Sequence, residues 1–151
     1  MYTIQKIKEE FHLTKAISFI ENKGSYTDTL TKEFVDFGGS CDVYIQEFDD
    51  EMLQNQVDVF NNFLLNFRNY LSRINSYIFS NLNAFEKDTD NELSFDVIFV
   101  PQTNLKYELI LVCGKKVKFL FLNRRITLRI EIKNGLIKSI KRTNNSTEDN
   151  D

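Results

Sequence analysis

The spacing of apolar residues changes once in the C-terminal two thirds of this chain, near residue 87. From Leu53 to Leu82 the apolar residues recur in steps of three and four, which is the period of an amphipathic helix. From Leu93 onward they alternate with other residues, which is the period of a strand. A long helical stretch followed by a run of strands predicts an α+β protein, with the helix packed on an antiparallel sheet.

The predicted helix runs from about Asp50 to Phe85. The acidic residues 49–51 suit its beginning, because side-chain oxygens cap free backbone N–H groups and the helix dipole favours negative charge there. A single helix of this length is uncommon in a small domain, so we expect either one long helix or a helix pair with a break near Asn75 or Ser76. The apolar stripe consists of Leu53, Val57, Phe60, Leu64, Phe67, Leu71, Ile74, Ile78 and Leu82.

About five strands are predicted after the polar connection 87–92, and they form an antiparallel meander. The strands span 93–99, 105–111, 117–121, 126–132 and 136–142. We expect turns at 113–116 and 123–125, where glycine and charged residues interrupt the alternation. Asn134-Gly135 is a strong hairpin signal, because both residues tolerate the positive φ angles of a tight turn.

The N-terminal third is predicted to be a hairpin region. Residues 2–11 suit either a short helix or a first strand, and the pattern leaves both open. The Ser/Thr-rich segment 25–31 indicates a loop. Gly38-Gly39 lies between two extended runs and predicts a hairpin. The extended runs of this region are 15–21, 33–37 and 41–48.

Charge is segregated along the chain. Residues 1–105 hold eight Lys/Arg against seventeen Asp/Glu, whereas residues 106–142 hold eleven against two. The acidic and basic segments either attract each other within the folded chain or present a charged face to a partner. We expect one domain over 1–142 and a disordered acidic tail over 143–151. The candidate binding residues are surface charges, namely Asp42, Asp49, Asp50 and Glu51 for a basic partner and Lys115, Lys116, Arg124 and Arg125 for an acidic one.

The sequence contains no motif for a catalytic, metal or cofactor site. His12 is the single histidine, and Cys41 and Cys113 lie far apart, so we expect no zinc site and interpret both cysteines as buried small apolar residues. The glycines match no phosphate-binding loop. The charged residues near the N-terminus do not fit a signal peptide, and no apolar stretch approaches the roughly 20 residues of a membrane helix. We therefore expect a cytoplasmic protein with no cofactor and no membrane partner.

Three segments resemble small bacterial α+β domains of the polymorphic-toxin immunity type. They are the acidic helix opening FDDEM at 48–52, the aromatic-rich helix that follows, and the closing strand, turn and strand RITLRIEIKNGLIKSI at 125–140. The resemblance covers about residues 40–141. It implies a single-domain cytoplasmic protein that lacks catalytic residues. In such domains the stretch before the closing hairpin is often acidic, whereas here residues 115–125 are basic.

The leading hypothesis is a non-enzymatic protein-binding module, in the form of an immunity-type protein that neutralises a toxin domain by direct binding. Complementary charges also allow two copies to pair as a homodimer. Several strands are apolar on both faces, so the face away from the helix needs the N-terminal hairpin or another chain to cover it. Two alternatives stay open. One is a nucleic-acid-binding accessory protein that uses the basic sheet 106–142, and the other is a small enzyme with scattered carboxylates.

Overall fold

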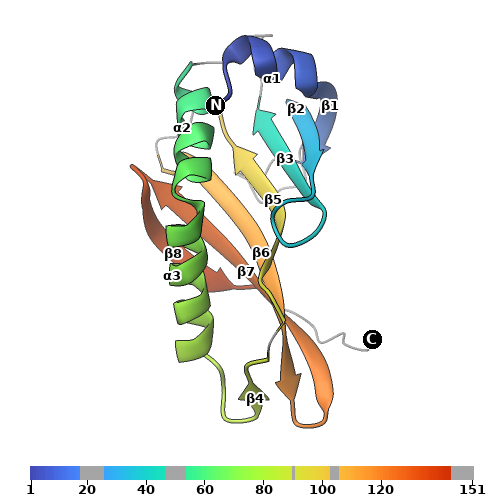
Figure 1. The fold of residues 1–151 in the computed structure, drawn as a ribbon, viewed down its shortest axis with the longest axis vertical. Helices are drawn as coiled ribbons and strands as arrows, with labels where there is room; N and C mark the ends of the chain where they lie inside the picture. The colour runs from blue at the N-terminus through green and yellow to red at the C-terminus, as the bar shows by residue number, and fades with distance from the viewer. Residues whose placement is uncertain (18–25, 47–53, 90, 103–105, 144–151) are drawn as a thin grey trace.

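The computed structural model describes residues 1–17, 26–46, 54–89, 91–102 and 106–143. Within these residues, three helices and eight strands form an α+β fold, and α2 and α3 lie across one face of a single sheet (Figure 1). The predicted α+β class is therefore confirmed, whereas the predicted helix and five-strand meander match only roughly. None of the described helices is long and apolar enough to cross a membrane.

Most of the sheet is antiparallel. The helices are α1 (Ile4–Glu10), α2 (Gln54–Leu65) and α3 (Phe67–Ser80). The strands are β1 (His12–Ile17), β2 (Tyr26–Phe34), β3 (Cys41–Gln46), β4 (Glu86–Lys87), β5 (Ser94–Val100), β6 (Leu109–Phe119), β7 (Leu122–Lys133) and β8 (Leu136–Arg142). The strand order is β1-β2-β3-β5-β6-β7-β8, and β4 pairs with β6. Among these pairs only β3 and β5 are parallel. The helices between these two strands return the chain to the end of the sheet at which β3 begins, so β5 runs in the same direction as β3.

The hydrophobic core lies between the helices and one face of the sheet. Alternate residues of each central strand point into it, as the period of two requires. The helices contribute the buried apolar side chains Val57, Phe60, Phe63, Tyr70, Ile74 and Ile78. The sheet contributes Cys41, Val43, Ile45, Phe95, Ile98, Val100, Leu109, Leu111, Cys113, Val117, Ile126, Leu128 and Ile130.

The helical part of the chain is a pair, with the break at Asn66 instead of Asn75 or Ser76. The Asn66 side chain donates hydrogen bonds to the backbone O and to Oδ1 of Asn62, both at 3.0 Å, and such local bonds compete with helix continuation. The second helix ends at Ser80, before the predicted end at Phe85. The predicted start at Asp50 lies outside the described residues.

The predicted turns at 113–116 and 123–125 are wrong, because β6 continues through the first and β7 includes the second. Gly114 serves a different purpose: a Cβ at this position would lie 2.5 Å from Nη2 of Arg125, so glycine lets that side chain cross the strand. The chain turns instead at Leu120-Phe121, between the paired residues 119 and 122. The predicted meander of about five strands is therefore replaced by β5, a long β6–β7 hairpin and β8.

The remaining strand predictions have mixed outcomes. Asn134-Gly135 forms the expected turn, with φ angles of 55° and 73°. The loop predicted at 25–31 is wrong, since most of it belongs to β2. The hairpin around Gly38-Gly39 is confirmed, because β2 and β3 pair antiparallel on either side. The segment 2–11, left open between helix and strand, contains α1, and the Thr3 side chain caps it by accepting a hydrogen bond from the Lys6 N–H.

Candidate protein-interaction surface

An exposed apolar surface lies at the end of the molecule where the β6–β7 hairpin turns beside β4 (Figure 1). Leu120, Phe121 and Leu122 are 60%, 94% and 65% exposed. Phe85 is 59% exposed, and its ring centroid lies 6.1 Å from that of Phe119 in an edge-on contact. We call these residues, Phe85, Phe119, Leu120, Phe121 and Leu122, the apolar tip. The composition is unusual for a turn, where Gly, Asn, Asp and Pro dominate.

The backbone of the apolar tip is also strained. Leu120 has a φ angle of 57°, in the left-handed region that costs a residue with a side chain roughly 1–2 kcal/mol. The Asn134-Gly135 turn at the other end of β7 uses residues that tolerate positive φ. Leucine at position 120 is thus less favourable for folding than asparagine or glycine.

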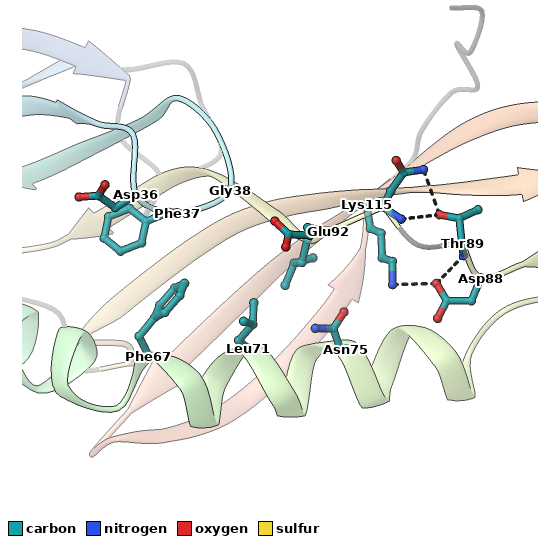
Figure 2. Close-up of a pocket in the computed structure, with 12 residues that line it drawn as sticks. Asp36, Phe37, Gly38, Phe67, Leu71, Asn75, Asp88, Thr89, Glu92 and Lys115 are labelled. Carbon is teal, nitrogen blue, oxygen red and sulfur yellow. Dashed lines mark hydrogen bonds and ion pairs between the residues drawn. The ribbon is translucent and has the colours of Figure 1, made fainter.

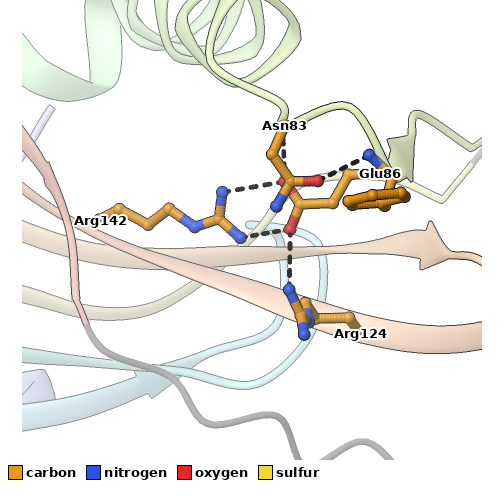
Figure 3. Close-up of polar contacts among 5 residues, drawn as sticks. Asn83, Glu86, Arg124 and Arg142 are labelled. Carbon is orange, nitrogen blue, oxygen red and sulfur yellow. Dashed lines mark hydrogen bonds and ion pairs between the residues drawn. The ribbon is translucent and has the colours of Figure 1, made fainter.

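A buried carboxylate anchors the base of the apolar tip (Figure 3). The Glu86 side chain is fully buried, and Arg142 Nη1 donates to its Oε1 at 3.0 Å while Arg124 Nη1 donates to its Oε2 at 3.3 Å. The Asn83 backbone N–H also donates to Oε1, at 3.0 Å. The hydrogen bond from Arg142 is the main reason that the pKa of Glu86 falls to about 2. This network joins β4, β7 and β8 and fixes the position of the neighbouring Phe85.

The same network reaches the apolar tip through Arg124. Its guanidinium carbon lies 3.7 Å from the ring centroid of Phe119, close enough for a cation–π contact. The Leu120 N–H donates to the backbone O of Phe85 at 3.1 Å, which ties the turn to the residue before β4. The turn that presents the exposed apolar side chains is therefore fixed by two contacts, the cation–π contact of Arg124 with Phe119 and the hydrogen bond of Leu120 to Phe85.

Three exposed lysines lie on β4 and β6 next to the apolar tip, and we call Lys87, Lys116 and Lys118 the basic collar. Lys87 and Lys118 are register partners on β4 and β6. Within the described part of the chain, none of the three forms an ion pair. The nearby carboxylates Glu86 and Asp88 are neutralised by other cations, so this end of the molecule is positively charged.

A cavity of about 490 Å³ opens between α3 and the sheet (Figure 2). Its apolar walls are Phe37, Phe67, Leu71 and Leu93. Its polar lining consists of Asp36, Gly38, Asn75, Asp88, Thr89, Asn91, Glu92 and Lys115. The exposed carboxylates of Asp36 and Glu92 form no ion pair with any described residue, so the cavity has a negatively charged lining.

One wall of the cavity is fixed by Lys115 and the residues after β4. The Lys115 Nζ lies 2.7 Å from Asp88 Oδ1, and its side chain is mostly buried. The hydrogen bond from Lys115 lowers the pKa of Asp88, so this carboxyl is charged at neutral pH. Thr89 Oγ1 donates to the Lys116 backbone O at 2.8 Å and accepts from the Asn91 N–H at 3.1 Å.

The sheet face opposite the helices carries paired charges. Arg125 Nη2 lies 2.6 Å from Asp96 Oδ2, and Arg129 Nε lies 3.1 Å from Glu131 Oε2. Burial raises the pKa of Glu131, but hydrogen bonds from Ser139 and Arg129 outweigh it, so the pKa lies below its usual value. Phe99 and Ile110 on this face are fully buried, so part of the face is covered within the chain.

The candidate binding residues predicted from the sequence differ in whether their charges are already paired within the chain. Lys115, Arg124 and Arg125 are each held by a carboxylate, and only Lys116 of that group is exposed without an ion pair in the described chain. Asp42 is half-buried on β3 and accepts a hydrogen bond from the Tyr44 hydroxyl at 3.4 Å. The predicted residues Asp49, Asp50 and Glu51 lie outside the described residues.

Sequence reasoning missed the apolar tip, because it placed Phe121 in a strand over 117–121 and the following turn at 123–125. The available signal was the break in alternation at Phe119-Leu120-Phe121-Leu122, four large apolar residues in a row. No known protein family, curated protein or solved structure matches this chain.

Proposed function

We propose that this chain is a non-enzymatic protein-binding module whose contact surface is the apolar tip. The observation that carries the proposal is the 94% exposure of Phe121 between two other exposed apolar residues. Large apolar side chains gathered on a surface mark interaction sites, and aromatic anchors supply much of the binding energy in protein interfaces. The strain at Leu120 supports the same conclusion, because folding alone favours another residue there.

The rigid base of the apolar tip suits binding. Association costs free energy for each side chain and loop that becomes ordered. The Glu86 network and the Leu120–Phe85 backbone hydrogen bond hold this hairpin before any partner arrives. A preorganised hairpin avoids much of that free-energy cost, so a small interface can still give a measurable affinity.

We propose further that the module is a cytoplasmic immunity-type protein, which neutralises a toxin domain by covering it. The resemblance of residues 48–52 and 125–140 to such domains supports this form of the proposal. A protruding apolar hairpin with a basic collar is suited to a partner that has an apolar pocket with an acidic rim. In this role the partner's surface, and not a chemical step, determines specificity.

The nucleic-acid alternative is less well supported. The cations of the basic segment that would have to meet phosphates include Lys115, Arg124 and Arg125, and each is bound to a carboxylate of this chain. Binding to single-stranded DNA or RNA that weakens steeply with salt would favour this alternative over protein binding.

The proposal is tested by affinity capture from the native host followed by mass spectrometry. For at least one protein that the wild-type chain captures, the amount captured by the Phe121→Ser variant should be at least about tenfold lower, because an aromatic anchor is removed. Lys138→Ser is the matched control, because Lys138 is exposed on β8 and should keep the capture. Circular dichroism checks that both variants fold. Equal capture of every protein by Phe121→Ser and wild type would contradict the proposal.

A further inference from the structure

We infer that the apolar tip of one copy inserts into the cavity of a second copy, and that two copies exchange tips reciprocally to form a dimer. This inference rests on the proposed function, because it takes the apolar tip to be a protein-binding surface. It adds the identity of one occupant: a second copy of this chain.

The cavity suits the apolar tip in size and in lining. A volume of about 490 Å³ falls within the range of protein pockets that hold small organic ligands, so one aromatic side chain fits. Two of its apolar walls, Phe37 and Phe67, are aromatic, and their ring centroids lie 5.2 Å apart. Phe121 would add a ring to the aromatic cluster that this pair forms with Phe63 and Phe95, in the offset or edge-on geometry that aromatic clusters prefer.

The charges around the two features are opposite. The basic collar of Lys87, Lys116 and Lys118 lies on β4 and β6 on one side of the apolar tip, while the exposed carboxylates of Asp36 and Glu92 line the cavity. Insertion would bring lysines and carboxylates that form no ion pair within the described residues to one another, which favours this docking and sets its orientation.

The apolar tip cannot fill the cavity of its own chain. Lys115 on β6 lies in the cavity wall, and Leu120 of the apolar tip lies just beyond the end of the same strand. Five residues of extended strand hold them about 17 Å apart. A second copy is therefore required. Reciprocal exchange closes the assembly at two copies, whereas insertion in one direction only would leave a free tip and a free cavity and would continue into a filament.

The first test is the molar mass of the purified full-length chain by size-exclusion chromatography with light scattering. Loading concentrations from about 1 μM to 1 mM cover the affinities expected of a small interface. The wild-type chain should shift from monomer to dimer across this range. Phe121→Ser should weaken dimerisation about 30-fold, as loss of an anchor residue does, while the control Lys138→Ser should leave it unchanged.

The second test reverses charge on each side of the contact. One variant carries Lys116→Glu and Lys118→Glu, and the other carries Asp36→Lys and Glu92→Lys. Each variant alone should be monomeric, because like charges then meet in both contacts of its dimer. An equal mixture should recover the wild-type dimer, because both contacts then join opposite charges. A purely structural defect would not be repaired by mixing, so the recovery is specific to the proposed contact.

The outcomes separate this inference from the proposed function. A chain that stays monomeric throughout, while Phe121→Ser still loses a captured protein, overturns self-pairing and leaves the protein-binding proposal standing. A dimer that is unaffected by charge reversal also overturns the inference. A monomer that binds phosphatidylserine vesicles through Phe121, and captures no protein through it, overturns both.

Discussion

Cys41 and Cys113 are fully buried on β3 and β6, and both are free thiols. Their interpretation as small apolar core residues is confirmed. Burial raises the pKa of each thiol to about 12. Because the thiolate is the reactive form, neither residue should react with iodoacetamide in the native protein at pH 8. Mass spectrometry should show both modified in urea and neither without it. Rapid labelling of one cysteine in the native protein would show that its strand opens.

Gly114 shows why single residues mislead sequence analysis. Glycine before two lysines predicts a turn, but here glycine allows the Arg125 side chain to lie across β6 and reach Asp96. Glycine marks either a turn or a close approach, and the neighbouring residues do not distinguish the two. By contrast, Asn134-Gly135 was predictable, since both residues suit positive φ and alternating runs flank them.

At the scale of elements, the short strand β4 depends on Glu86. Its folded-state pKa of about 2 lies below the ordinary value of 4.5, so the unfolded chain binds more protons between these values. The stabilisation is therefore present above about pH 5 and is lost as the pH falls towards 2. The linkage amounts to about 3 kcal/mol in the free energy of unfolding, because each pKa unit is worth about 1.4 kcal/mol.

Glu86→Gln tests this linkage. The variant should lose roughly 3 kcal/mol of unfolding free energy at pH 7, because Arg124 and Arg142 lose their buried partner. It should also lose much of the acid sensitivity of the wild type. Urea unfolding at several pH values measures both quantities, and Glu9→Gln, at an exposed position on α1, serves as the control. An unchanged slope of stability against pH would contradict the assigned role.

At the scale of the whole molecule, one core joins the N-terminal and C-terminal parts. The buried cluster extends from Ile7 on α1 to Ile132 on β7, and the parallel β3–β5 pair joins the two parts of the sheet. We expect one cooperative unfolding transition. In calorimetry, the measured enthalpy should equal the van't Hoff enthalpy, and two resolved transitions would show that the parts unfold separately.

The sequence by itself determined the features that depend on neighbouring residues. These are the α+β class, the amphipathic helical stripe, the hairpin around Gly38-Gly39 and the closing Asn134-Gly135 turn. Each follows from local periodicity or local turn chemistry, which a single chain displays directly.

The tertiary structure alone decided the candidate site. Arg124 and Arg142 meet Glu86 across 38 and 56 residues of chain, so no local pattern reveals that both arginines already bind a buried carboxylate. The same is true of Lys115, which pairs with Asp88. Contacts between distant segments decide which charges remain free and which apolar residues stay exposed. They leave the side chains of the basic collar and of Leu120, Phe121 and Leu122 exposed.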